Sequence, residues 1–302
     1  MKSLAETRFS ILMKDDALCS ELVENICSSN SFNFKEERIY EGSRILYEIE
    51  EDKIVKVFSQ NELSFCNNEA KYLETLHGKL SVTTPELFVK GIYNGLPFLI
   101  MQKQKGFPLK SVWNDISIWE KRRIIAQIAD MLKELHSLPC ELFPTREPGW
   151  KDFINTQTLD LLQNHRESGL SNAWTENISR FIQNTDEVEN SSESVICHTE
   201  IMQEHLFVEE SNRGFNITGL IDFEPSMIAV PEYDFCSIGL FISAGDKGLF
   251  NHFLDTYGYK GDSRGIMRML LLHRYSNMKW FMSTLPDTVR FNSVEELSDY
   301  WF

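Results

Sequence analysis

Three ionisable residues in the second half of the chain stand at a spacing that suits phosphoryl transfer. Glu200 and His205 frame a short segment, and Asp222 follows the apolar run 217–221. A second apolar run, 206–208, precedes a polar turn, so the two runs are expected to pair as a hairpin. One end of that hairpin could bring these three residues together. They would supply a carboxylate that accepts a hydroxyl proton, a ligand, and a second carboxylate that binds a metal ion. Phosphoryl transfer needs this set of groups.

A lysine earlier in the chain suggests the other half of this chemistry. Lys56 lies in the apolar run 54–58, where a period of two places it on the same face as apolar neighbours. A lysine on an apolar face needs a partner, and Glu69, within the helical pattern 62–76, is the best placed acid. Such a pair can hold a phosphate oxygen. The alternative is an edge-strand lysine whose ammonium group reaches water.

The surrounding pattern predicts an α+β chain in which strands come first and helices follow. In the first part we expect a helix over 15–26, three strands near 38–41, 45–49 and 54–58, a helix over 62–76, and strands at 85–89 and 96–101 joined by a turn at Asn94-Gly95. In the second part we expect helices within 119–138, 145–185, 237–244, 248–257 and 264–284. The acidic stretch 186–194 is interpreted as a surface loop.

Two domains follow from this order of elements. Residues 1–104 are expected to form an N-terminal lobe with a five-stranded antiparallel sheet and an N-terminal helix. A polar, glycine-containing hinge at residues 102–106 would connect it to a mainly helical C-terminal lobe, residues 105–302. A ligand site is common at such a junction.

Composition restricts the class of protein. The 302 residues are 42% hydrophobic and 12% aromatic, which is globular, and no stretch is long and apolar enough for a membrane span. The net charge of −15 and the lack of a basic stripe argue against a nucleic-acid binder. An acidic body attracts cationic partners, although solubility alone would also explain it. Six scattered cysteines predict reduced thiols in a cytoplasmic protein.

In their order along the chain, several short segments resemble the aminoglycoside phosphotransferases and their relatives, which are small-molecule kinases with a protein-kinase-like fold. The resemblance covers nearly the whole chain from about residue 36 and lies in the segments 54–57, 68–70, 96–101, 198–200, 219–224 and 231–235. His198-Thr199-Glu200 stands where the family has His-Gly-Asp. The last segment lacks the first aspartate of the family's Asp-Pro-x-x-Asp element.

The resemblance implies a two-lobed kinase that moves the γ-phosphoryl group of ATP, with Mg²⁺ or Mn²⁺, to a hydroxyl of a small cationic acceptor such as an aminoglycoside. The nucleotide-binding lobe would be N-terminal, and the C-terminal lobe would carry the catalytic segment and the acceptor site. The implied site residues are Glu200 and His198 in catalysis, Asp222 and His205 at the metal, Lys56, Glu69, Gly42, Ser43, Met101 and Lys103 at the nucleotide, and Asp234 in support of the catalytic segment.

Two departures from the family pattern leave the activity open. The carboxylate of Glu200 sits one methylene further out than that of an aspartate, and a small misplacement of a reacting group can cost about 100-fold in rate. His205 replaces an asparagine, although magnesium prefers oxygen ligands and imidazole suits softer metals. His205 can therefore hold a metal, contact phosphate or be structural, and Glu200 can be a salt-bridged turn residue. A pseudokinase that binds nucleotide or a partner is the alternative function, and nucleotidyl transfer is a third.

Overall fold

The computed structural model of the chain describes residues 4–40, 42–144, 148–183, 193–286 and 288–302. Most of the acidic stretch 186–194, interpreted above as a loop, lies outside the described residues. The chain divides into two compact units, which are described separately. The first unit contains residues 1–107, 207–209 and 218–226, and the second contains residues 108–206, 210–217 and 227–302. Short returning segments therefore join the N-terminal part of the chain to form the first unit.

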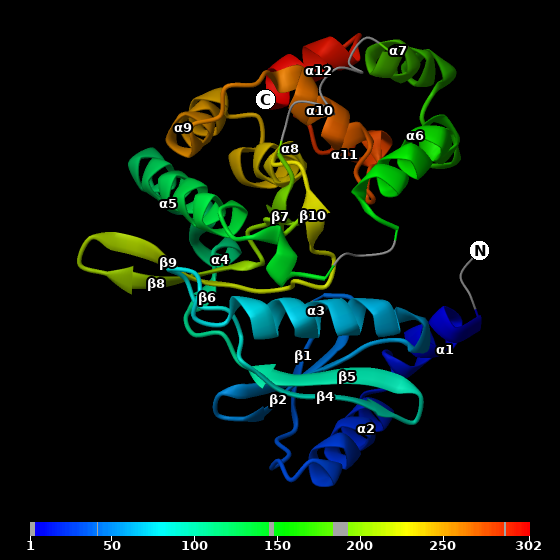
Figure 1. Ribbon diagram of the computed structural model, residues 1–302, viewed down its shortest axis with the longest axis vertical. Helices are drawn as coiled ribbons and strands as arrows, with labels where there is room; N and C mark the ends of the chain where they lie inside the picture. Colours follow the sequence, from blue (N-terminus) through cyan, green and yellow to red (C-terminus); the bar gives the residue numbers. More distant parts are fainter. Residues whose placement is uncertain (1–3, 41, 145–147, 184–192, 287) are drawn as a thin grey trace. The chain divides into compact units, whose positions relative to one another are not determined.

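The first unit contains the predicted five-stranded sheet (Figure 1). Its elements are α1 (Leu4–Leu12), α2 (Asp16–Ser29), β1 (Glu37–Ile39), β2 (Ile45–Glu50), β3 (Lys53–Val57), η1 (Gln60–Glu62), α3 (Leu63–Leu76), β4 (Leu87–Tyr93) and β5 (Leu96–Gln102). The strand order is β1-β2-β3-β5-β4, and every neighbouring pair is antiparallel. The predicted turn at Asn94-Gly95 is confirmed, and both residues have the positive φ angles (49° and 79°) that a tight hairpin turn requires.

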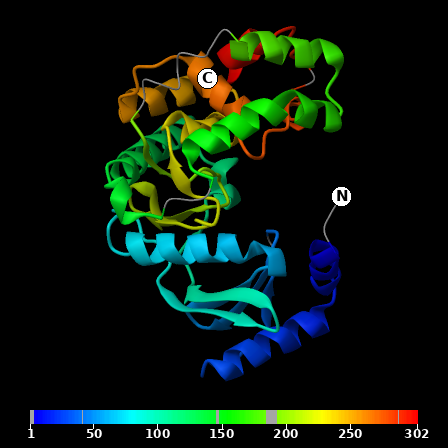
Figure 2. The ribbon, with the colours of Figure 1, turned by 45° about the vertical axis from the view of Figure 1, so that its right-hand side comes forward.

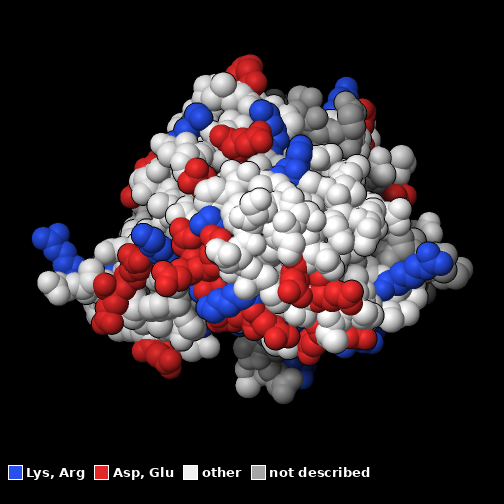
Figure 3. All heavy atoms as spheres, turned by 90° about the horizontal axis from the view of Figure 1, so that it is seen from below, with Lys and Arg blue, Asp and Glu red and all other residues white. Residues whose placement is uncertain are grey.

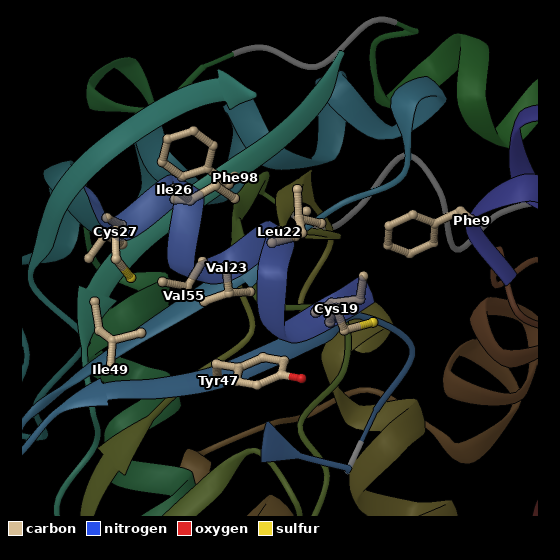
Figure 4. Packing of buried hydrophobic residues seen from close by; sticks show 13 residues of the cluster. Phe9, Cys19, Leu22, Val23, Ile26, Cys27, Tyr47, Ile49, Val55 and Phe98 are labelled. Atoms are coloured by element: carbon tan, nitrogen blue, oxygen red, sulfur yellow. The ribbon is translucent and has the colours of Figure 1, made fainter. Parts of the chain in front are cut away.

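The two faces of this sheet carry different helices (Figures 1 and 2). Helix α2, predicted from its apolar spacing, has Asp15 as its N-cap, and the side chain of Asp15 accepts a hydrogen bond from the Leu18 amide. Its apolar side chains pack on one face of the sheet, together with Phe9 of α1, a helix that the sequence pattern did not predict (Figure 4). Helix α3 lies on the other face, to which the strand alternation also directs Lys56.

The second unit is mainly helical. Its elements are α4 (Lys110–Trp113), α5 (Ile118–His136), η2 (Cys140–Leu142), α6 (Trp150–Glu167), α7 (Asn172–Gln183), β7 (Val195–Cys197), β10 (Met227–Ala229), α8 (Glu232–Ser237), the π-helix η4 (Ile238–Ser243), α9 (Lys247–Tyr257), α10 (Ser263–Leu271), α11 (Met278–Ser283) and α12 (Val294–Trp301). Helices α5 and α9 pack side by side (Figure 1). The short strands β7 and β10 pair antiparallel, with Cys197 opposite Met227.

The hairpin predicted from the two apolar runs is confirmed. Strands β8 (Leu206–Ser211) and β9 (Gly214–Leu220) are neighbours in a three-stranded sheet that also contains β6 (Phe107–Pro108), in the order β6-β8-β9. Strand β9 begins directly after the turn with Gly214, which has a φ angle of 97°. Such a backbone conformation favours glycine.

One helix prediction was wrong. The pattern over residues 264–284 predicted one helix, but the structure has α10 and α11, separated by residues 272–277. Helix α11 has its own N-cap, Asn277, whose side chain accepts a hydrogen bond from the Trp280 amide. In the break, the ring nitrogen Nε2 of His273 lies 3.1 Å from the carbonyl oxygen of Thr199. This tertiary hydrogen bond joins two segments that are 74 residues apart in the sequence.

His165 is a buried histidine whose titration should make stability depend on pH. It lies on α6 with 1% of its surface exposed, and neither ring nitrogen has a hydrogen-bond partner among the described residues. Burial lowers the pKa of His165 from 6.5 to about 4. Between pH 6.5 and pH 4 the unfolded chain therefore binds more protons at this position than the folded chain. The free energy of unfolding is thus highest above pH 6.5 and falls as the pH drops towards 4. His165 accounts for about 3 kcal/mol of this loss.

We expect the substitution His165→Leu to reduce this acid sensitivity. Thermal unfolding measured at pH 7 and at pH 4.5 should show a smaller drop in Tm for the variant than for the wild type, with an equal or higher Tm at pH 7. His77→Leu is the control, because His77 is exposed. An equal drop for wild type and His165→Leu would contradict the assignment.

The six cysteines are free thiols, and five of them are buried. Burial raises the pKa of Cys27 to about 11 and that of Cys66 to about 12. Cys140 is half-buried and donates a hydrogen bond to the carbonyl oxygen of Ser194. Thiols whose pKa is raised carry little thiolate at neutral pH, so they react slowly.

Charge is unevenly distributed over the surface. Acidic side chains gather in groups on the face seen in Figure 3, with basic side chains between them. The formal net charge is −15. Among the described residues, no helix is long and apolar enough to cross a membrane.

Candidate active site

The centre of the first unit's site is a buried lysine that contacts three carboxylates. Lys56 Nζ lies 2.8 Å from Glu69 Oε2, 2.6 Å from Asp222 Oδ1 and 3.1 Å from Glu224 Oε2. The predicted pairing of Lys56 with Glu69 is therefore present, and the alternative of a lysine reaching water does not apply, because its side chain is 8% exposed. We call Lys56, Glu69, Asp222 and Glu224 the lysine cluster.

Negative charge exceeds positive charge within the lysine cluster. Burial alone would lower the pKa of Lys56, but its three carboxylate neighbours raise it well above its ordinary value. Burial raises the pKa of Glu69 to about 7, and the charges of Asp222 and Glu224 add to the effect while Lys56 opposes it. Lys56 therefore stays charged at neutral pH, while the carboxyl group of Glu69 holds a proton more readily than that of an ordinary glutamate.

Two residues without a predicted role of their own, Arg44 and Asn68, hold Glu224 in place. Arg44 Nη2 lies 2.8 Å from Glu224 Oε1 and 3.0 Å from Glu62 Oε1. Asn68 Nδ2 donates hydrogen bonds to the carbonyl oxygens of Glu224, at 3.0 Å, and Ser226, at 2.8 Å. Because Asn68 precedes Glu69 on α3, this helix fixes both the partner of Lys56 and the segment that carries Asp222.

The lysine cluster has a donor set that suits a hard divalent cation. One carboxylate oxygen from each of Glu69, Asp222 and Glu224 lies within 4.8 Å of the other two. Magnesium and manganese prefer such oxygen ligands. Asp222 has a φ angle of 73°, which is uncommon for a residue other than glycine and occurs often at functional sites. The donor set therefore fits the metal that the sequence led us to expect, and the role of Asp222 as a ligand stays a prediction.

The other nucleotide residues expected from the sequence occupy three places in the first unit. Gly42, with a φ angle of 83°, and Ser43 precede β2, and Ser43 Oγ accepts a hydrogen bond from Arg44. Met101 is buried in β5. Lys103 follows β5, its ammonium group pairs with Glu48, and its amide donates to the carbonyl oxygen of Asp52. Their roles at a nucleotide stay predictions.

The expected catalytic segment, His198-Thr199-Glu200, lies in the second unit directly after β7. The buried carboxylate of Asp234, on α8, accepts hydrogen bonds from the backbone amides of His198, at 3.0 Å, and Thr199. It also accepts one from His136 Nε2, at 2.9 Å. Asp234 thus ties the start of the catalytic segment to α5 and α8.

Thr199 adopts a left-handed backbone conformation that is sterically unfavourable for a β-branched side chain. Its φ angle is 75°, which is an outlier for a β-branched residue, and its buried hydroxyl has no hydrogen-bond partner within the described part of the chain. The family pattern has glycine at this position, where such a φ angle carries no steric cost. The hydrogen bonds to Asp234 and His273 hold this strained turn in place.

The turn brings His198, Glu200 and His205 together. The Glu200 amide donates to His198 Nδ1 at 3.3 Å, and His205 Nδ1 donates to the Glu200 carbonyl oxygen at 2.7 Å. One ring nitrogen of His205 therefore supports the backbone of Glu200. This contact favours a structural contribution from His205.

Asp234 offers a test of how the catalytic segment is held. We expect Asp234→Asn to lower the free energy of unfolding by about 2–4 kcal/mol, because the amide group replaces one acceptor oxygen by a donor and leaves a buried N–H unpaired. Chemical denaturation measures this loss. Asp255→Asn, at an exposed position on α9, is the control and should change little. Equal stability of the two variants would show that the buried carboxylate does not hold the segment.

Residues 42–270 match the model of the phosphotransferase enzyme family. The chain belongs to this family. Its fold is the α+β, kinase-like fold of phosphotransferase structures, with a five-stranded antiparallel N-terminal sheet followed by a mostly helical part. No curated protein matches the sequence.

Solved phosphotransferases of low sequence identity share this fold. The GDP complex of wild-type aminoglycoside 2'-phosphotransferase-IIIa is 18% identical, with a TM-score of 0.71, and the match covers 95% of this chain and 100% of that one. ADP-bound APH(2'')-Ib is 19% identical, with a TM-score of 0.60 and coverage of 93% and 97%. The macrolide 2'-phosphotransferase MphH from Brachybacterium faecium is 13% identical, with a TM-score of 0.62 and coverage of 87% and 91%. These phosphotransferases are named for two different classes of antibiotic, the aminoglycosides and the macrolides.

Proposed function

We propose that this phosphotransferase uses ATP to phosphorylate a hydroxyl group of a small molecule. The observation that carries the proposal is the lysine cluster, in which a buried strand lysine, a helix glutamate and Asp222 meet within a chain of this family. The nucleotide-bound relatives support a nucleotide as the phosphoryl donor. Phosphoryl transfer relies mainly on positioning and on neutralising charge, and the cluster supplies groups for both.

In the proposed mechanism, Lys56 contacts the nucleotide phosphates and Glu69 orients it. Asp222, with Glu224 beside it, would hold Mg²⁺ or Mn²⁺, which when bound neutralises charge on the phosphates. Lys56 exchanges carboxylate contacts for phosphate contacts when nucleotide binds, and its raised pKa keeps it cationic. Arg44 keeps Glu224 in place through this exchange.

Glu200 is proposed to orient the acceptor hydroxyl and to accept its proton as the new P–O bond forms and the bond to the leaving ADP breaks. His198, Thr199 and His205 hold the backbone around Glu200. Asp234 acts as a positioning residue, since it contacts the catalytic segment through backbone amides. We propose that the reaction takes place in the cytoplasm, where ATP is available and where six free thiols would remain reduced.

The acceptor is proposed to be a small molecule with a hydroxyl group. The net charge of −15 favours a cationic compound such as an aminoglycoside. Net charge acts over the whole surface, however, and it identifies no contact with the acceptor. Aminoglycosides are therefore one class to test among hydroxyl compounds.

The decisive experiment measures products with and without an acceptor. Purified protein is incubated with ATP and Mg²⁺ or Mn²⁺ and a panel of aminoglycosides, macrolides, amino alcohols and hydroxy acids, and ADP, AMP and product mass are determined. Acceptor-dependent ADP formation with a mass gain of one phosphoryl group supports the proposal. Nucleotide binding without turnover on any acceptor would favour the pseudokinase, and AMP-modified product would indicate nucleotidyl transfer.

A further inference from the structure

A cation beside the catalytic segment has no counter-charge among the described residues. Arg274 lies in the break between α10 and α11, and no described carboxylate is within ion-pair distance of its guanidinium group. Its residue surface is partly buried. A partly buried charge without a partner is costly, so this arginine calls for a physical explanation.

The contacts of Arg274 hold its guanidinium group in a fixed orientation. The guanidinium group lies over the ring of Phe153, on α6, and its Cζ atom is 5.5 Å from the ring centroid. Nη2 donates to Met227 Sδ at 2.9 Å, and the backbone amide donates to the hydroxyl oxygen of Tyr233 at 3.0 Å. The group is therefore clamped by a ring, a sulfur atom and its own backbone.

The outer edge of this guanidinium group remains available to a ligand. Nε is fully buried and has no hydrogen-bond partner in the described part of the chain. The side chain of Arg274 also contacts the buried hydroxyl of Tyr233, and part of the residue's surface remains exposed to solvent. Nη1 and the second N–H of Nη2 form an end-on fork, which matches the two oxygens of a carboxylate.

Two links place this fork beside the catalytic segment. His273, the preceding residue, contacts the Thr199 carbonyl oxygen through Nε2 at 3.1 Å. Met227, the sulfur partner, is paired with Cys197, which directly precedes His198. All of these residues belong to the second unit. A small molecule held by Arg274 would thus lie next to the residues that are proposed to act on the acceptor.

We propose that Arg274 is the docking group for a carboxylate on the acceptor, which is therefore a hydroxy acid or a hydroxy amino acid. This inference rests on the proposed phosphotransferase function and names its substrate class. Phe153 provides an apolar platform under the guanidinium group, and the acceptor carboxylate supplies the missing counter-charge. An acceptor that also carries an ammonium group would remain attracted by the acidic surface.

A binding experiment tests the site independently of catalysis. Isothermal titration calorimetry compares benzoate with its neutral analogue benzamide on the wild type, Arg274→Gln, Arg274→Lys and Arg122→Gln. Arg122 is an exposed arginine on α5 and is the matched control. We expect benzoate to bind better than benzamide, and Arg274→Gln to weaken benzoate binding about tenfold to a hundredfold. Arg274→Lys should fall between, because it keeps the charge but not the fork.

A turnover experiment tests the substrate class. Mandelate is compared with benzyl alcohol, and serine with 2-aminoethanol, since each pair differs only in the carboxylate. We expect a higher kcat/KM for the carboxylate member, lost in Arg274→Gln and retained in Arg122→Gln. Absence of ADP with every acceptor would contradict the phosphotransferase proposal, while the calorimetry would still decide the role of Arg274. Benzoate that binds no better than benzamide, or equally well to a folded Arg274→Gln protein, would overturn the inference.

Discussion

Replacing Asp222 by asparagine is expected to reduce ADP formation by about 10³-fold or more. Asp222 lies 2.6 Å from Lys56 and is the proposed ligand of the nucleotide-bound metal. A metal ion contributes several kcal/mol of charge stabilisation to the transition state, and about 1.4 kcal/mol corresponds to a factor of ten in rate. Steady-state kinetics of ADP release, with saturating ATP and a working acceptor, measures the effect. The variant should also require a higher metal concentration for nucleotide binding.

The loss should occur without unfolding, which makes this substitution informative. Three carboxylates face Lys56 in the lysine cluster, so removing one charge leaves Lys56 with Glu69 and Glu224 and relieves repulsion between like charges. We expect an unchanged or higher Tm, and a fall in the pKa of Glu69 from about 7, since the charge of Asp222 is one of its causes. Asp115→Asn, at an exposed position, is the control. An Asp222→Asn protein that keeps a tenth of the wild-type rate would rule out the assigned role.

Replacing Glu200 by glutamine is expected to lower kcat by about 10²- to 10⁴-fold, the range in which a positioned general base contributes. The amide keeps the size of the side chain but neither its charge nor its affinity for a proton. The backbone bonds that join Glu200 to His198 and His205 do not involve the side-chain carboxylate, so the turn should persist. The nucleotide Kd should stay within about twofold to threefold of the wild-type value, because the proposed nucleotide groups lie elsewhere in the chain.

The variant Glu200→Asp separates the effect of the negative charge from the effect of side-chain length. Glu200→Asp restores the family's residue type and keeps the carboxylate, but it shortens the side chain by one methylene. If the rest of this site is adapted to glutamate, we expect kcat to fall about tenfold to a hundredfold, between the wild type and Glu200→Gln. A Glu200→Gln protein as active as the wild type would show that the carboxylate takes no proton and that Glu200 is only a turn residue.

Local periodicity identified Glu69 as the best placed partner of Lys56 but left a lysine that reaches water as the alternative, and the pair is present in the structure. A lysine at an inward position of a strand requires a partner, and the following helix offered an acid at a suitable distance along the chain. The same reasoning predicted the five strands, because each run alternates and ends at a polar turn. The positive φ angle of Thr199 was not visible in the pattern, since nothing local indicates that threonine would adopt a conformation typical of glycine.

Ion pairs between residues far apart in the chain could not be predicted from the sequence. Arg44 and Glu224 are 180 residues apart, and the pattern only placed Arg44 in a turn and Glu224 two residues after Asp222. The position of Glu224, two residues after Asp222, was the feature of the sequence that could have indicated a third carboxylate beside Lys56. The break between α10 and α11 was also missed, because apolar spacing continues through it while His273 makes a tertiary hydrogen bond. Arg274 consequently remained unassigned until its neighbours in space were known.

The positions of the cysteines allow local unfolding of this protein to be detected by labelling its own thiols. Cys140 is half-buried, so a short pulse of a neutral alkylating reagent should modify it first and leave the others protected. Two sets of buried thiols belong to different units: Cys19, Cys27 and Cys66 in the first, and Cys197 and Cys236 in the second. Mass spectrometry of pulse-labelled peptides would therefore show, without any engineered probe, which unit opens first as denaturant rises. It would also show which unit a nucleotide or an acceptor protects.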